Sequence, residues 1–121
     1  MTNTKKIIEV TLHLFSGEPN PKWVLAETQG DELKRKLSLE LPPDRPKLIP
    51  TGYGGFIIRN PSKVPTIPDK VHVYDGVLII TDKGTTNYYK DVGKIEEWLF
   101  NQARELGYGE AIEKRRGYSR K

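Results

Sequence analysis

Two histidines are the side chains in this sequence most suited to general acid–base catalysis or metal binding. His13 and His72 each lie in an alternating polar and apolar run, on the face opposite the apolar residues. Two histidines without a third ligand at a defined spacing do not make a metal site. Glu9 shares a strand face with His13, but four residues of extended chain separate them too far for a direct pair. The sequence therefore predicts no metal, no cofactor and no assigned catalytic residue.

Two loops contain the other residue types that suit ligand binding. The segment SGEPNP, residues 16–21, is stiffened by two prolines, and TGYGG, residues 51–55, surrounds Tyr53 with glycines. We expect both loops to meet at one end of a sheet, with Tyr53 as an exposed aromatic anchor and Trp23 packed beneath. The same glycines also suit a β-bulge before a strand. The predicted binding residues are Ser16, Glu18, Asn20, Tyr53 and Arg59.

The strands that would position these residues follow from alternation and turn signals. Residues 6–15 alternate, which predicts a half-buried strand with its apolar side chains on one face. A second strand is expected over 56–59. Asp75-Gly76 and Lys83-Gly84 then predict two tight turns that join three antiparallel strands. Of the adjacent Tyr88 and Tyr89, one must face the core, because neighbouring strand residues point to opposite faces.

Two helices are expected from apolar residues at helical spacing. The first covers 29–39, with Thr28 as its cap and Leu33 and Leu37 facing inward. The second covers 92–106, between Asp91 as cap and Gly107 as stop. We expect Trp98 to be largely buried within its apolar stripe, which comprises Ile95, Trp98, Leu99, Ala103 and Leu106.

This order of elements predicts an α+β fold. Residues 1–112 form a single domain, a mainly antiparallel sheet of four to five strands with two helices packed on one face. Residues 113–121 form a basic, disordered C-terminal tail. No internal repeat or low-complexity segment interrupts the chain.

The composition excludes several functional classes and locates the charge. The 121 residues include no cysteine, which excludes disulfides, zinc–thiolate sites, iron–sulfur clusters and a cysteine nucleophile. The formal net charge is +4, yet residues 1–112 contain fifteen basic and fifteen acidic side chains. The excess therefore belongs to the tail. No apolar run is long enough to span a membrane and no signal peptide begins the sequence, which predicts a cytoplasmic protein without membrane contact.

A wider resemblance rests on LHLFSGEPNPKWVL, GYGGFIIR, VYDGVLI and DVGKIEEWLFNQAR. These segments resemble a family of small uncharacterised bacterial proteins with an FSG-x-PNP-x-W signature, a GY-x-GF signature and a tryptophan in the last helix. The resemblance covers about residues 8–106. It implies one domain and a shared surface, and it implies no reaction. The matching positions are Phe15, Ser16, Gly17, Pro19, Asn20, Pro21, Trp23, Gly52, Tyr53, Gly55, Phe56 and Trp98.

The sequence thus favours a non-enzymatic binding module that uses the two loops to hold a peptide or protein partner. Two alternatives stay open. One is nucleic-acid binding through the cations of the tail, and the other is a small enzyme that uses His13 or His72 with a carboxylate. The sequence leaves the oligomeric state undetermined. The tail cations are Lys114, Arg115, Arg116, Arg120 and Lys121.

Overall fold

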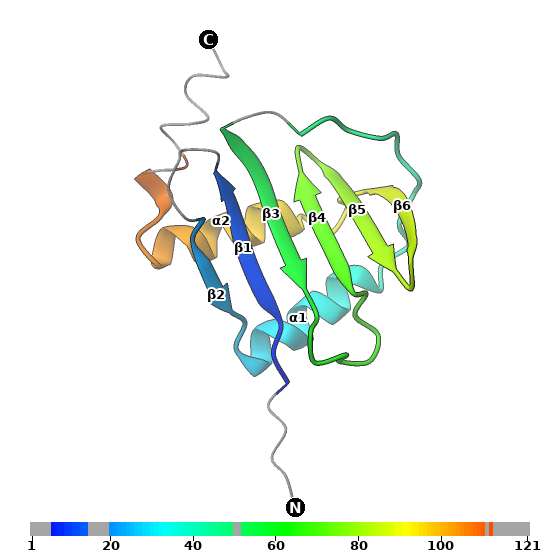
Figure 1. Cartoon of the computed structure of the whole chain (residues 1–121), viewed down its shortest axis with the longest axis horizontal. Coiled ribbons are helices and arrows are strands. Elements are labelled where there is room, and N and C mark those ends of the chain that lie inside the picture. Colours follow the sequence, from blue (N-terminus) through cyan, green and yellow to red (C-terminus); the bar gives the residue numbers. More distant parts are fainter. Residues whose placement is uncertain (1–5, 15–19, 50–51, 111, 113–121) are drawn as a thin grey trace, which may run out of the picture.

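The computed structural model of the protein describes residues 6–14, 20–49, 52–110 and 112. These residues form one α+β unit with a single antiparallel sheet in the strand order β2-β1-β3-β4-β5-β6 (Figure 1). The elements are β1 (Glu9–Leu14), β2 (Lys22–Val24), α1 (Glu27–Leu37), β3 (Tyr53–Arg59), β4 (Lys70–Tyr74), β5 (Val77–Asp82), β6 (Thr85–Lys90) and α2 (Ile95–Glu105). The α+β prediction is confirmed.

The predicted number of strands is wrong, because the sheet has six strands rather than four or five. The additional one is β2, which pairs with the outer side of β1 and places Trp23 opposite Val10. The sequence predicts only a short extended piece here, with Trp23 and Leu25 on one side, and so short a piece does not by itself establish a strand. The pairing therefore depends on contacts with β1, which local sequence does not reveal.

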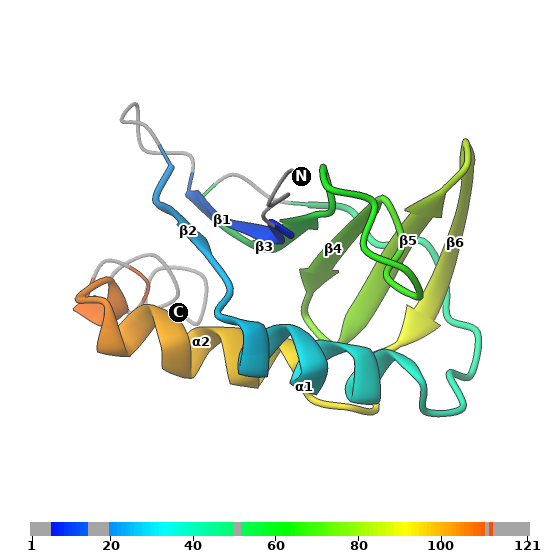
Figure 2. The ribbon, with the colours of Figure 1, turned by 90° about the horizontal axis from the view of Figure 1, so that it is seen from below.

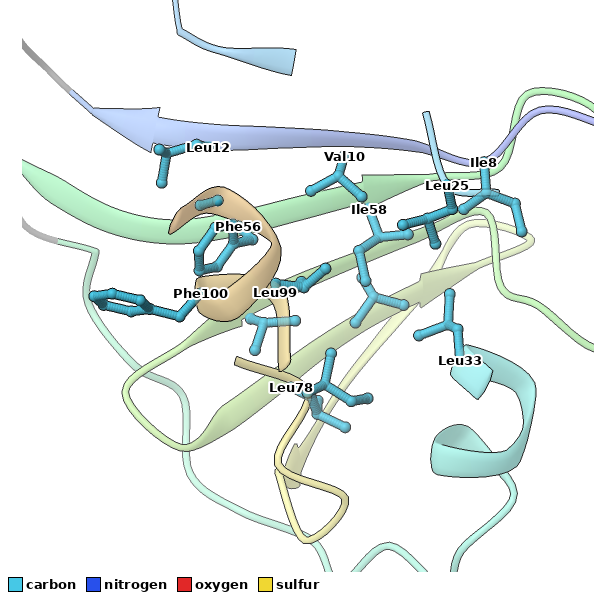
Figure 3. Close-up of a cluster of buried hydrophobic side chains, with 14 of the residues drawn as sticks. Ile8, Val10, Leu12, Leu25, Leu33, Phe56, Ile58, Leu78, Leu99 and Phe100 are labelled. Carbon is cyan, nitrogen blue, oxygen red and sulfur yellow. The ribbon is translucent and has the colours of Figure 1, made fainter. Parts of the chain in front are cut away.

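Both helices lie on the same side of the sheet (Figure 2). Alternate strand residues point toward them, and side chains from the sheet and both helices form one apolar cluster (Figure 3). Its members include Val10, Leu12, Leu33, Phe56, Ile58, Val71, Val73, Leu78, Ile95 and Leu99, each almost completely buried. Of the alternation predicted for residues 6–15, the part over residues 8–14 is confirmed by the buried Ile8, Val10, Leu12 and Leu14.

The helix ends differ from the predictions in detail. Helix α1 begins two residues earlier than expected, where the side chain of Gln29 accepts a hydrogen bond from the Ala26 N–H at 2.7 Å. Thr28 therefore lies inside the helix. Helix α2 begins at Ile95, and both carboxylate oxygens of Asp91 accept hydrogen bonds from the first N–H groups, at 2.8 and 2.9 Å. Asp91 thus supplies acceptors to the first turn, but the N-cap residue is Lys94, and the helix begins three residues later than the predicted start at residue 92.

The apolar stripe of α2 is only partly as predicted. Trp98 is half-buried rather than largely buried, and its ring lies 5.7 Å from the Lys36 ammonium nitrogen of α1. Leu106 is half exposed, which corrects its assignment to the core. Phe100, which the predicted stripe omitted, is buried. Beyond the helix, the chain turns at Gly107 with φ of +95°, as the sequence predicted.

The two predicted hairpin turns are both present. Asp75 and Gly76 join β4 to β5, and Lys83 and Gly84 join β5 to β6, all four with positive φ. Positive φ at both central residues defines the type I′ turn, whose twist matches that of the flanking strands. These turns set the registers of β4, β5 and β6.

The connector, residues 40–49, leads from α1 past the edge of β6 to the end of the sheet where β3 begins (Figure 1). It is held to β6 by hydrogen bonds from the Asp44 N–H to the Tyr88 carbonyl, 2.9 Å, and from the Lys90 N–H to the Pro42 carbonyl, 2.8 Å. Farther along, Lys47 pairs with Asp75 at 2.9 Å. The connector thus covers part of the outer edge of β6.

Neither helix in the described part of the chain has the length and apolar character needed to cross a bilayer.

Candidate functional site on the open sheet face

The open face is the side of the sheet turned away from the two helices. Strand register arranges its side chains in rows that cross the strands. One row contains Thr11, Ile57, His72, Ile79 and Tyr88, and the next contains Glu9, Arg59, Lys70, Thr81 and Thr86. Tyr88 faces this side and Tyr89 faces the core, as expected for adjacent strand residues. No helix covers these rows.

A glycine bulge in β3 brings the two histidines together. The register between β1 and β3 shifts between Leu12 and Leu14, where Gly54 and Gly55 lie opposite. Because β3 has no side chain there, His13 of β1 reaches toward His72 of β4, and the ring centroids are 5.7 Å apart. A Cβ atom added to Gly54 would lie 3.3 Å from His13 Nδ1. The bulge is therefore what makes a histidine pair possible.

Both members of this pair have lowered basicity. Burial lowers the pKa of His13 below its ordinary value, and His72, Arg59 and Lys70 lower it further. Burial is also the main cause that lowers the pKa of His72, although a hydrogen bond between its Nε2 and the Gly54 carbonyl, 2.7 Å long, acts in the opposite direction. At neutral pH both rings are therefore uncharged.

Two cations lie beside the histidine pair on the open face. Arg59 and Lys70 are cross-strand neighbours, and neither forms an ion pair with another described residue. The carboxylate opposite Arg59 is Glu9, the sole acid among the described strand residues that face this side. The open face thus carries an excess of positive charge, although residues 1–112 as a whole are balanced.

Thr11 adds an unusual polar atom to the same surface. Its side chain is 5% exposed, and its hydroxyl has no hydrogen-bond partner among the described residues. A buried hydroxyl without a partner is costly, so such atoms often mark positions where a ligand or water supplies the missing bond. Thr11 lies next to Ile57 in the row that leads to His72.

The connector covers one end of the histidine pair. Ile49 lies above Gly54, because a Cβ added to that glycine would come within 2.8 Å of Ile49 Cγ2. His72 is 9% exposed, while His13 is half-buried. An incoming ligand therefore meets His13 and the two cations before it meets His72.

A separate cavity of about 710 Å³ lies between the first turns of α1 and the start of β1. Its walls contain apolar side chains, two lysines and two acids. The lining residues are Lys6, Ile7, Ile8, Val24, Leu25, Ala26, Glu27, Gly30, Asp31, Lys34 and Val64. Because the opposite charges balance, this cavity favours no particular ligand charge.

The residues predicted for binding have different places in the structure. Tyr53 is 8% exposed and its hydroxyl donates a 2.6 Å hydrogen bond to Glu96, so the expectation of an exposed anchor is wrong. Its segment is a bulged strand rather than a flexible loop. Asn20 is partly exposed, and its side chain accepts a hydrogen bond from the Leu14 N–H at 2.8 Å. Arg59 is exposed on the open face.

The predicted meeting of the two loops stays a prediction, because residues 16–19 and 51 lie outside the described part of the chain. Leu14 pairs with Tyr53, so the end of β1 lies beside the start of β3. Trp23 packs against Phe56 and donates a hydrogen bond from its indole N–H to Gln102 at 2.9 Å. Ser16 and Glu18 lie outside the described residues, as do all five tail cations, and these predictions stay predictions.

The structure adds Lys70 and Thr11 to the candidate site and pairs the two histidines. The sequence signal for the pair was the position of both rings on polar strand faces, together with a Gly-Gly step that removes the side chain between them. Within the described ranges, no group of three or more histidine, cysteine or acidic side chains could hold a metal ion. The arrangement instead suits recognition of a negatively charged group.

No known family model matches the chain, and no curated protein sequence or solved structure matches it either.

Proposed function

We propose that the protein is a non-enzymatic binding module that holds an acidic peptide segment of a partner protein on its open face. The observation that carries the proposal is the grouping of the histidine pair with Arg59 and Lys70 on a sheet face that no helix covers. Glu9 is the sole described acid of these strand rows. A carboxylate that enters this surface finds complementary charge.

Apolar side chains beside the cations favour a peptide over a purely polar ligand. Ile57, Ile79 and Tyr88 lie in the same row as His72 and are half-buried, so each retains surface for a partner. A matching segment would place carboxylates over Arg59 and Lys70 and apolar side chains over this row. Nucleic acid is a poorer match, because the face offers few cations and Glu9 would repel phosphate.

The proposed partner is still a peptide or protein, as the sequence favoured. Most of the proposed binding site, however, is now on the open face of the sheet and not in the two loops. Arg59 belongs to both versions, whereas Tyr53 is replaced by the histidine pair. Ser16 and Glu18 lie outside the described part of the chain and stay predictions.

Peptide titrations followed by backbone amide NMR test the proposal. The probes are dodecapeptides in which glutamate alternates with leucine or tyrosine. The control peptides have glutamine in place of every glutamate. We expect binding of the acidic probes, with the largest shift changes in β3, β4 and β5, and affinity at least about tenfold lower for the glutamine probes. Absence of binding by every probe, or shift changes confined to the helical side, would overturn the proposal.

Matched charge variants separate the open face from general electrostatic attraction. The double variant Arg59→Gln with Lys70→Gln should weaken binding of the acidic probe about tenfold or more, since two charge-assisted contacts are lost. The control is Arg35→Gln with Lys94→Gln, which removes the same charge from exposed positions at the helices. The control should bind within about twofold of the original protein. Equal losses in both double variants would show that net charge, not this surface, holds the peptide.

A further inference from the structure

The hydrogen bond of His72 fixes where this ring can accept a proton. A carbonyl oxygen only accepts hydrogen bonds, so the Nε2 atom that lies 2.7 Å from the Gly54 carbonyl must carry the hydrogen. The neutral ring then has its lone pair on Nδ1. Protonation therefore occurs at Nδ1, and it leaves the bond to Gly54 intact. The ring can change charge without rearranging the bulge that holds it.

The surroundings keep the pair uncharged in the free protein. On the open face, Lys70 and Arg59 disfavour an additional positive charge on His72, and so does the burial of its ring. The opposing acid is Glu96 of α2, whose carboxylate is already engaged by the Tyr53 hydroxyl and the Gly76 N–H.

Two further titratable groups complete the surroundings. Glu9 lies on β1, in the row of Arg59, and Tyr74 lies two residues beyond His72 on β4. A carboxylate bound among Arg59, Lys70 and the rings would reverse the local balance. It would compensate both cations and accept a hydrogen bond from a protonated imidazole.

We infer that binding of the peptide carboxylate at the open face is coupled to the uptake of one proton by the His13–His72 pair. This inference rests on the function proposed above and adds its regulation. The uptake is limited to one proton because two charged rings at 5.7 Å, beside two fixed cations, would repel one another. Affinity for an acidic peptide therefore rises as the pH falls from neutral. It declines again once the peptide carboxylates themselves become protonated, below about pH 5.

Calorimetric titration of the acidic dodecapeptide at pH 6.5, in two buffers of different ionisation enthalpy, measures the protons exchanged on binding. We expect net uptake, with an affinity that increases between pH 7.5 and pH 6 by at most about tenfold per pH unit, the limit for one proton. Binding without uptake, or with proton release, would overturn this inference and leave the binding function standing. No binding at either pH would overturn the binding function itself.

Variants and ring titrations assign the proton to the pair. The double variant His13→Gln with His72→Gln should reduce the uptake toward zero, because either ring alone can still accept the proton, while the helix-side control Arg35→Gln should leave it unchanged. Imidazole NMR titration of the unaltered protein provides a readout that does not depend on a variant's folding. The midpoint of at least one histidine should move to higher pH when the peptide is present. Midpoints that stay in place, together with uptake retained in the double histidine variant, would assign the proton elsewhere.

Discussion

His72 joins the candidate site to the stability of the fold. Its ring is almost fully buried, its Nε2–H is donated to the Gly54 carbonyl, and it lies in the middle of a sheet row. Histidine at such a position is neutral in the folded protein and free to become charged in the unfolded chain. The same residue therefore affects both peptide recognition and the pH dependence of folding.

The pH dependence of stability is the first prediction. Burial lowers the pKa of His72 in the folded state below its unfolded value, near 6.5, so the unfolded chain binds more protons once the pH falls below that value. The free energy of unfolding should be constant above about pH 7 and decrease as the pH falls from about 6.5 toward 5.5. Urea unfolding at several pH values measures it. His72→Gln should reduce the slope and leave the contribution of His13, whose pKa is also lowered, and a level curve for the unaltered protein would contradict the prediction.

At the scale of elements, the bulge in β3 is the feature on which the site depends. Gly55 has φ of +85°, and a Cβ atom added there would lie 1.9 Å from the Val73 carbonyl oxygen of the neighbouring strand. Neither the backbone conformation nor the space therefore accepts a side chain. Gly52, just before the strand, has a similar φ of +86° but no heavy atom within 4 Å of an added Cβ.

These two glycines give a matched pair of substitutions. Gly55→Ala should cost more than about 3 kcal/mol or prevent folding, because backbone strain adds to a clash with a strand that cannot yield. Gly52→Ala should cost only about 1 to 2 kcal/mol, from the positive φ alone. Chemical denaturation of both variants provides the comparison. Losses of similar size would mean that close packing against β4 does not hold the bulge.

Much of the secondary structure was predictable because its causes are local. Alternation predicted β1, and paired turn residues predicted the hairpins around Gly76 and Gly84. Strand β2 was not counted as a strand, because three residues are too few to establish the alternation of polar and apolar residues that identifies one. Tyr53 was misassigned because a glycine-rich segment has the same composition whether it forms a mobile loop or the bulged start of a strand.

The candidate site was less predictable than the elements, because it depends on strand order. Sequence places His13 and His72 on polar faces but does not say which strands are neighbours. Their approach requires β3 between β1 and β4, and it requires Gly54 at the crossing. Such pairings join distant segments, and their registers are set by the whole core rather than by any local pattern.

For the whole molecule, charge distribution separates the two binding hypotheses. Residues 1–112 are balanced, with fifteen cations and fifteen anions, whereas residues 113–121 supply five cations and one acid. Peptide binding is proposed for the open face, which belongs to residues 1–112, where the numbers of basic and acidic side chains are equal. Nucleic-acid binding, the alternative from the sequence, would depend on the terminal cations.

Removal of residues 113–121 tests this separation. The shortened chain should retain its affinity for the acidic dodecapeptide within about twofold, since Arg59 and Lys70 remain. Any salt-sensitive binding of duplex DNA should be lost, because each phosphate contact contributes a slope of about 0.9 in the salt dependence. Titrations of both ligands over a range of salt concentrations give the comparison. DNA binding that survives the truncation would move the phosphate contacts to the folded part.

The position of β1 in the sheet affects how the protein folds while it is being synthesised on the ribosome. Val10 lies opposite Ile58, so the first strand is completed by a segment that the ribosome makes much later, whereas β3 to β6 follow one another closely. Closing that long loop slows the pairing. Until β3 emerges, the apolar face of β1 and its unpaired backbone are available to other chains. The nascent protein should therefore be most prone to aggregation, and most dependent on chaperones, before residue 59 leaves the exit tunnel.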